Sequence, residues 1–276
     1  MIETEDAALT DPDGEVMPLV SVVVPCFNHA AYVEKAIASV LGQTYPAIEL
    51  IVVDDGSSDA SPEVLRRLAD QHGFTLVLQE NRGVCRTLNR GIRAFSKGEY
   101  IALLASDDLW REDKIAAQMA LLRGAGDARL CFSQAVEFAD DAQPQVGRVF
   151  PRRVRTGQVL DRVFLRQHVP AGTLLFERRL FDELGGFDEA LKEEDWDFVI
   201  RSAAVTPFAA VPAPLLCYRA HAGNTMRTRS RRLIFEQKAR ILTKNMALVS
   251  PWRWLASILF HFTYDIVVSP ILRRSA

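Results

Sequence analysis

Carboxylates cluster at two places where a run of apolar residues ends. The stretch "IVVDDGSSD", residues 51–59, places three carboxylates within six positions, and "YIALLASDD", residues 100–108, ends in two more. Two like charges about 4 Å apart cost on the order of 1 kcal/mol even in bulk water. Each cluster is therefore either a solvated turn or a site that meets a cation or several hydrogen-bond donors.

The surrounding sequence predicts how these clusters are positioned. Short β-branched runs alternate with segments of helical periodicity. Strands are predicted at 19–25, 49–55, 75–80 and 100–108, and helices at 30–43, 61–73, 84–98 and 111–124. Four successive strand–helix units predict an α/β fold, with a Rossmann-like, mostly parallel sheet flanked by helices on both faces.

Polar residues follow each predicted strand, and parallel strands end at one rim of a sheet, where ligands bind. A single carboxylate at a strand end is most simply a turn or helix cap. Several such groups on one rim favour a binding site instead.

Composition excludes several classes of protein. The chain has 276 residues, 49% of them hydrophobic, which suffices for one large core or a core with a small lobe. A net charge of −2 argues against a nucleic-acid partner. Four scattered cysteines, with no secretory signal before the first strand, predict a reduced, cytoplasmic setting. Residues 1–17 are acidic and poor in large apolar groups, which predicts a disordered tail.

The kind of ligand can be narrowed further. No glycine-rich dinucleotide motif follows the first strand, and no P-loop is present. A rim of carboxylates would repel a diphosphate unless a divalent cation lay between them. Mg²⁺ and Mn²⁺ bind carboxylates together with substrate phosphates. Ser106 to Asp108 therefore forms a candidate metal clamp for a nucleotide diphosphate.

Five motifs together resemble family 2 inverting glycosyltransferases of the GT-A fold. They are the stretch 20–59, "NRG" at 81–83, "GEYIALLASDD" at 98–108, "GGFDEAL" at 185–191 and "EEDWDFVIR" at 193–201. The resemblance implies a glycosyltransferase domain over 18–225, with a nucleotide-binding half at 18–124 and an acceptor-binding half at 125–225. Residues 226–276 would form a C-terminal helical extension.

The resemblance also implies roles for individual residues. Asp55 would accept a hydrogen bond from uracil while Asp54 braces the loop, Asp107 would contact the ribose or the metal, and Asp195 would be the catalytic base. The other donor-site residues implied are Pro25, Phe27, Asn28 and Arg82, the acceptor-side residues are Gly172, Glu194 and Trp196, and the metal ligands are Asp108 and His221.

Simpler interpretations stay open for some of these residues. Glu194 and Asp195 begin a predicted helix, where carboxylates are favoured by the helix dipole alone. Trp196, like Trp110, is more typical of packing than of a sugar platform. A lone histidine such as His221 is often not a ligand.

The C-terminal region has two interpretations. The basic stretch 227–240, which includes Arg227 and Arg229, is either a solvated helix face or a surface that attracts anionic headgroups or a pyrophosphate-linked acceptor. Residues 254–272 approach a membrane span in length, but a central Asp265 would cost roughly 2.5–3.5 kcal/mol on insertion scales. We expect either an interfacial helix, followed by Arg273 and Arg274, or a helix docked on this chain or a second copy.

These observations predict a metal-dependent transferase that uses Mn²⁺ or Mg²⁺ and moves a sugar from a nucleotide donor, UDP-linked, to a hydroxyl of a saccharide or lipid-linked saccharide. Such a protein would act in cell-surface polysaccharide or glycoconjugate synthesis, in the cytoplasm or on the cytoplasmic face of the membrane, as a monomer or homodimer. The processive motif Q-x-x-R-W is absent, which favours transfer of one or a few sugars. The alternatives are a sugar-nucleotide pyrophosphorylase and a catalytically inactive nucleotide- or membrane-binding scaffold.

Overall fold

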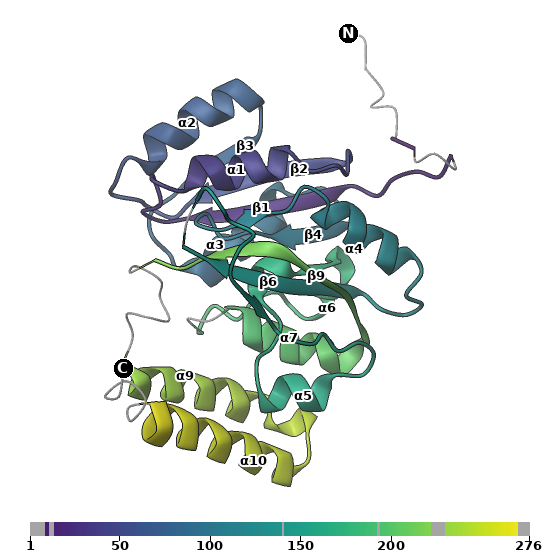
Figure 1. The fold of residues 1–276 in the computed structure, drawn as a ribbon, viewed down its shortest axis with the longest axis vertical. Helices are drawn as coiled ribbons and strands as arrows, with labels where there is room; N and C mark the ends of the chain where they lie inside the picture. Colours follow the sequence, from purple (N-terminus) through teal and green to yellow (C-terminus); the bar gives the residue numbers. More distant parts are fainter. Residues whose placement is uncertain (1–8, 11–13, 140, 192–193, 222–229, 270–276) are drawn as a thin grey trace.

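The computed structural model describes residues 9–10, 14–139, 141–191, 194–221 and 230–269, with only the backbone at position 194. Its first half contains the four predicted strand–helix units (Figure 1). They are β1 (Val20–Cys26), α1 (Val33–Leu41), β2 (Ile48–Asp54), α2 (Ser61–His72), β3 (Thr75–Leu78), α3 (Val84–Arg90) with the π-helical turn η1 (Gly91–Phe95), β4 (Tyr100–Leu103) and α4 (Lys114–Arg123). The strands pair in parallel in the order β3-β2-β1-β4, which confirms the predicted sheet.

The second half extends this sheet with a mixture of parallel and antiparallel pairs. Its elements are β5 (Leu109–Trp110), β6 (Leu130–Phe138), β7 (Arg148–Phe150), α5 (Leu160–Leu165), η2 (Ala171–Thr173), β8 (Leu175–Glu177), α6 (Arg178–Glu183), α7 (Glu194–Val205) and β9 (Phe208–Arg219). The order continues as β4-β8-β6-β9-β5, with β6 and β9 parallel and β4 antiparallel to β8. Strand β5 places the loop 104–108 beside the end of β9.

Two hydrophobic clusters fill the two faces of the sheet. Along β1, Val22 and Val24 join the cluster beneath α1, α2 and α4, whereas Val23 joins the cluster beneath α3, α6 and α7. Successive side chains of a strand point to opposite faces, so a strand buried on both sides must be apolar throughout. This requirement explains why the predicted strands read as continuous apolar runs.

The turn after β2 requires glycine. Gly56 has a φ of +75°, and a Cβ there would lie 2.6 Å from the backbone nitrogen of Asn81. The turn thus brings the loop after β3 against the carboxylates at the end of β2. Within the stretch 51–59, Asp55 is stabilised by this approach, because the loop after β3 donates backbone N–H groups to its carboxylate.

The C-terminal region forms two helices at the end of the molecule opposite α1 and α2 (Figure 1), and the second of them packs against α5. They are α9 (Arg231–Lys244) and α10 (Pro251–Phe262), joined by η3 (Met246–Leu248), and α10 continues as the π-helical segment η4 (Thr263–Val268). No helix within the described residues has the length and apolar character needed to cross a membrane. Arg227, Arg229, Arg273 and Arg274 lie outside the described residues.

Part of the predicted N-terminal tail has defined structure. Thr10 and Val16 form an antiparallel bridge, and the backbone nitrogen of Met17 donates to the carbonyl of Leu9 at 2.7 Å. All four cysteines are buried and free of disulfides.

Candidate functional site

The carboxyl end of β2 forms a hydrogen-bonded pocket for one carboxylate. Asp55 is 5% exposed and accepts bonds from the side-chain nitrogen of Gln79 at 2.7 Å and from the backbone nitrogens of Arg82 and Gly83 at 2.8 and 2.9 Å. A carboxylate has about four lone-pair sites. Three are used within the protein, so one remains for a donor on a ligand.

The loops after β1 and β2 are tied to each other beside this pocket. Asn28, with a φ of +56°, accepts from the backbone nitrogen of Ser58 at 2.8 Å and donates its own backbone N–H to the hydroxyl of Ser57. Asp54 is buried and accepts from the backbone nitrogen of Ser57 at 3.0 Å, so it braces the loop. Phe27 is 46% exposed, and Pro25 lies within β1, which continues one residue further than predicted.

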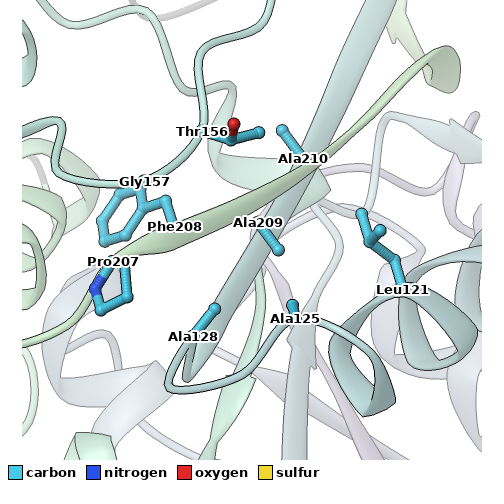
Figure 2. A pocket seen from close by; sticks show the side chains of 9 residues that line it. All are labelled: Leu121, Ala125, Ala128, Thr156, Gly157, Pro207, Phe208, Ala209 and Ala210. Atoms are coloured by element: carbon cyan, nitrogen blue, oxygen red, sulfur yellow. The ribbon is translucent and has the colours of Figure 1, made fainter.

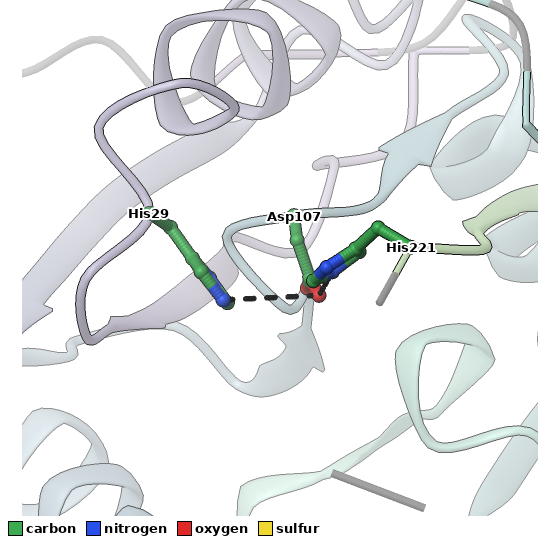
Figure 3. Close-up of side chains that lie close together, drawn as sticks. All are labelled: His29, Asp107 and His221. Atoms are coloured by element: carbon green, nitrogen blue, oxygen red, sulfur yellow. Dashed lines mark hydrogen bonds and ion pairs between the residues drawn. The ribbon is translucent and has the colours of Figure 1, made fainter. Parts of the chain in front are cut away.

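A group of two imidazoles and one carboxylate lies further along the same rim (Figure 3). It consists of His29 from the loop after β1, Asp107 from the loop after β4, and His221 after β9. The Nε2 atoms of His221 and His29 lie 3.0 and 3.9 Å from the same Asp107 carboxylate oxygen. One ligand atom from each residue lies within 4.8 Å of the others, so the three residues could together hold a metal ion.

The environment of His29 suits it for metal binding. Its Nδ1 lies 2.8 Å from the hydroxyl of Ser106. A Nδ1–H donated to Ser106 leaves the Nε2 lone pair directed toward Asp107. Burial lowers the pKa of His29, partly opposed by the charge of Asp107, so the neutral, ligating form prevails at neutral pH.

Asp108 differs from Asp107 in its surroundings. It is 4% exposed, and one carboxylate oxygen accepts from the backbone nitrogen of Arg219 at 2.8 Å. Burial and, to a smaller extent, the nearby charge of Asp107 raise the pKa of Asp108 well above its ordinary value. Arg219 also donates from Nε to the backbone carbonyl of Asp107 at 2.7 Å, and so supports the loop that carries both acids.

The expected catalytic base lies at the start of α7. The Oδ2 atom of Asp195 accepts from the side-chain nitrogen of Gln167 at 3.1 Å, and Oδ1 accepts from the backbone nitrogen of Trp196 at 2.8 Å. Burial raises the pKa of Asp195, while the bond from Gln167 lowers it in part. The side chain of Glu194 lies outside the described residues.

The segment before α7 is anchored next to the pocket of Asp55. The Sγ of Cys85, in the first turn of α3, lies 3.2 Å from the carbonyl oxygen of Leu191. Asp195 follows Leu191 by four positions, a stretch that spans at most about 14 Å. Cys85, Leu191 and Trp196, the neighbour of Asp195, belong to the same hydrophobic cluster on one face of the sheet.

The two tryptophans near acidic motifs are packing groups. Trp196 is 2% exposed and donates to the carbonyl of Val163 at 2.7 Å, so its ring has no open face for a sugar. Trp110 is 5% exposed and donates to the carbonyl of Gly172 at 2.8 Å, which fixes the turn η2. A Cβ on Gly172 would lie 3.1 Å from Leu216, so glycine permits this close packing.

Three site residues were not identified from the sequence. His29, Arg219 and Gln167 each acquire their role from a partner distant along the chain. A histidine three residues after the first strand, on the rim that also carries "SDD", was the available signal for His29. The other two have no comparable signal, because the fold alone brings them to Asp108 and Asp195.

A separate hollow of about 300 Å³ lies between the end of α4, the loop 156–157 and the start of β9 (Figure 2). Its described lining is apolar apart from Thr156 and includes no ionisable side chain. It is therefore unsuited to the chemistry of the rim.

Comparisons with known proteins agree with this geometry. A family model described as Glycosyl transferase family 2 matches residues 21–185. An uncharacterized glycosyltransferase of Rickettsia typhi is 33% identical over 215 residues, which are 76% of this chain and 67% of that protein.

Two solved structures share the fold. The crystal structure of S. aureus TarS 1–349 in complex with UDP-GlcNAc has a TM-score of 0.70 at 17% identity and covers 89% of this chain and 73% of that one. The mannosyltransferase PcManGT from Pyrobaculum calidifontis, in complex with GDP-Man and Mn²⁺, has a TM-score of 0.66 at 21% identity, with 97% and 75% covered.

Proposed function

Since the chain belongs to glycosyl transferase family 2 and has the GT-A fold, we propose that it transfers a sugar from a UDP-linked donor to an acceptor hydroxyl with inversion, using a divalent cation. The observation that carries this proposal is the group formed by His29, Asp107 and His221, on the rim that also holds Asp55. This rim thus offers a set of possible metal ligands and, at Asp55, a pocket suited to a nucleotide.

The donor atoms of this group fit a cation of the Mn²⁺ type. Two imidazole nitrogens and one carboxylate oxygen suit Mn²⁺ better than Mg²⁺, which prefers oxygen ligands throughout. His29, Asp107 and His221 would hold the ion, and Asp108 is the ligand implied by the family resemblance. A bound cation would stabilise the negative charge on the departing diphosphate.

The nucleotide base is assigned to Asp55 and Phe27. The remaining lone pair of Asp55 can accept the N–H of uracil, and the exposed ring of Phe27 offers a face for stacking. Asn28 and Asp54 hold the two loops that form this pocket. Arg82 donates its backbone N–H to Asp55, and its side chain is exposed.

Asp195 is assigned as the general base. Burial moves its pKa toward the working pH, where a proton acceptor is most effective, and Gln167 holds the carboxylate in place. Asp195 removes the acceptor proton as the hydroxyl attacks the anomeric carbon from the face opposite the diphosphate. One displacement of this kind inverts the configuration without a covalent intermediate.

The two rival functions differ from this proposal in what they require. A sugar-nucleotide pyrophosphorylase needs a glycine-rich, basic loop after the first strand, and "PCFNHA" has neither feature. An inactive scaffold has no need of a buried base with a raised pKa in addition to a nucleotide pocket.

We also assign a membrane-contact role to α10 and η4, because the amphipathic pattern of this helix is inverted. Its polar residues at four-residue spacing, Ser257, His261 and Asp265, are at most 4% exposed. Apolar residues on the other side are exposed: Trp252 by 79% and Leu259 by 54%. A helix on a water-soluble protein normally buries its apolar face.

Neighbouring charge supports a lipid surface as the partner of this helix. The adjacent α9 carries five basic side chains: Arg232, Lys238 and Lys244 pair with carboxylates, whereas Arg231 and Arg240 have no ion pair among the described residues. Basic side chains beside an exposed apolar face favour anionic headgroups. Lys238 also pairs with the buried Asp265 at 2.9 Å, which fastens η4 to α9. A saccharide or lipid-linked saccharide made at the cytoplasmic face would be an accessible acceptor.

The activity can be tested with a panel of nucleotide sugars. We expect Mn²⁺-dependent hydrolysis or transfer with a UDP-sugar, no turnover in chelator, and a first-formed sugar whose anomeric configuration is opposite to that of the donor. Retention of configuration would contradict the single displacement. Absence of turnover with every donor, despite Mn²⁺-dependent UDP binding, would favour the inactive scaffold.

A further inference from the structure

The outer face of α3 and η1 bears a groove of about 370 Å³ that is lined mainly by arginine. Its lining side chains are Arg82, Arg86, Asn89, Arg90, Arg93 and Glu189, and we refer to it as the arginine groove. Residues spaced by three and four positions share one helix face. Cys85 and Leu88 are buried on the opposite face of α3, so the arginines lie on its outward side.

Among the described lining residues of the arginine groove, four arginines face a single acidic side chain, so most of the positive charge is not balanced. Glu189, the one carboxylate among the described lining residues, accepts from Arg86 at 3.2 Å. Arg90 and Arg93 donate to neutral oxygens instead, the side chain of Gln79 at 2.8 Å and the carbonyl of Gly185 at 2.6 Å. A neutral acceptor fixes a guanidinium in position but leaves its charge for another partner.

The groove lies between the donor pocket and the segment that carries the base. One wall is α3, and the other is the segment 185–191, held by the bond from Asn89 to the carbonyl of Phe187 at 2.9 Å. That segment leads within four residues of Leu191 to Asp195. The nucleotide-side boundary is Arg82, whose backbone donates to Asp55.

The groove is also distant from the metal-ligand group. None of the groove's lining residues belongs to that group, and three strand spacings in the order β3-β2-β1-β4 separate the end of β3, after which Arg82 lies, from the end of β4, after which Asp107 lies. At about 4.8 Å each, these spacings amount to roughly 14 Å. A diphosphate held at Asp107 would therefore leave the arginine groove open to another anion.

We propose that the arginine groove binds a phosphate group carried by the acceptor while the acceptor hydroxyl lies at Asp195. Guanidinium forks bind phosphate through paired, charge-assisted hydrogen bonds, and several fixed forks select a phosphate over a neutral sugar. This inference rests on the proposed function and adds the acceptor class to it: a saccharide or polyol that bears phosphate.

A binding experiment tests the groove directly. The probe is glycerol 3-phosphate, with glycerol as its neutral counterpart, followed by ligand-observed NMR on the full chain in chelator. We expect the phosphate form alone to bind, and the double variant Arg86→Gln/Arg93→Gln to bind it about tenfold or more weakly, since two charge-assisted contacts are lost. Arg179→Gln changes an exposed arginine outside the groove and serves as the matched control.

Saturation with UDP and Mn²⁺ distinguishes the acceptor groove from the donor site. We expect glycerol 3-phosphate to remain bound under these conditions; displacement by UDP, or equal affinity in the wild type and the double variant, would overturn the proposal. Unfolding curves of the double variant exclude misfolding as the cause of lost binding. Failure of the wild type to bind UDP with Mn²⁺ would refute the proposed function instead, and the two failures are thus separable.

A transfer assay tests the acceptor class. Acceptors are offered in pairs that differ by a single phosphate, and we expect the phosphorylated member to have a KM about tenfold lower, as for one added charge-assisted contact. This preference disappears in Arg86→Gln/Arg93→Gln. Equal KM values for both members of every pair in the wild type would overturn the assignment.

Discussion

The sharpest test of the base assignment is Asp195→Asn. Asparagine keeps the shape of the side chain and the oxygen that accepts from the backbone of Trp196 at 2.8 Å, but it cannot take up the acceptor proton. Loss of general-base catalysis typically lowers turnover by about 10²–10⁴-fold. At about 1.36 kcal/mol per tenfold, this corresponds to roughly 2.7–5.4 kcal/mol of transition-state stabilisation.

The effect on stability follows from the direction of the pKa shift. Burial raises the pKa of Asp195, so ionisation of this group in the folded protein costs stability as the pH rises past its ordinary value. Asparagine removes that cost, but its amide must be accommodated opposite the side-chain nitrogen of Gln167, which costs about 1 kcal/mol. We expect the two effects to offset each other, so that the variant stays folded.

Turnover and UDP–Mn²⁺ affinity are measured on the same preparation, with the exposed Asp182→Asn as the matched acid-to-amide control. Wild-type turnover should rise with pH through the raised pKa of Asp195, because only the ionised form accepts a proton. If Asp195 serves only the helix dipole, substitution costs roughly 0.3–1 kcal/mol of stability and leaves the rate per folded molecule unchanged. Substantial remaining turnover in the folded variant would therefore refute the base role.

Three further predictions concern the nucleotide pocket, the C-terminal helix and acid stability. Asp55→Asn should weaken UDP binding by about tenfold or more, since one acceptor for uracil or the loop 82–83 is lost, and an unchanged calorimetric affinity would contradict this role. Leu259→Asp should abolish sedimentation with anionic vesicles without lowering the melting temperature; a wild-type chain that stays in the supernatant and dimerises through this face would instead assign α10 to a second copy. Burial, followed by the charge of Lys238, lowers the pKa of His261 to about 4, so urea unfolding should show stability decreasing by up to about 1.4 kcal/mol per pH unit between 6.5 and 4, and the same pH dependence in His261→Gln would refute the assignment.

The first half of the fold was predictable because its signals are local. Each parallel strand is buried on both faces and so appears as an apolar run, and each helix shows its own periodicity. The second half was not assigned strand by strand: β6 and β9 are long, but β5, β7 and β8 have only two or three residues and depend on pairing with distant strands. Their partners lie far along the chain, as with Tyr100 and Glu177 across β4 and β8.

The position of a site residue was predictable from the sequence where it depends only on the strand that the residue follows. Asp55 directly follows β2, Asp107 lies four residues after β4, and both lie on the rim. The position of His29 beside Asp107 depends on how the loop after β1 folds back over that rim. Gln167 and Asp195 meet because α5, just before Gln167, packs against α7, and no spacing in the sequence encodes their contact.

The inverted pattern of α10 shows a different limit. Its sequence periodicity indicates an amphipathic helix, and a helix of that kind would normally turn its apolar face inward. Here the packed face instead combines Trp254 and Ile258, which contact the core, with the buried Asp265, which pairs with the half-buried Lys238 at 2.9 Å. Periodicity cannot reveal that a polar residue is buried through an ion pair to another helix.

The central claim is that the group of His29, Asp107 and His221 couples a cation to a uridine diphosphate. Isothermal titration calorimetry of UDP, with Mn²⁺ and then with chelator, tests it most directly in the wild type, Asp107→Asn and Asp108→Asn. We expect Mn²⁺ to tighten UDP binding strongly in the wild type and Asp107→Asn to lose this enhancement, with Asp108→Asn reporting whether the second acid also ligates the ion. UDP affinity that is the same with Mn²⁺ and with chelator in the wild type would contradict the account.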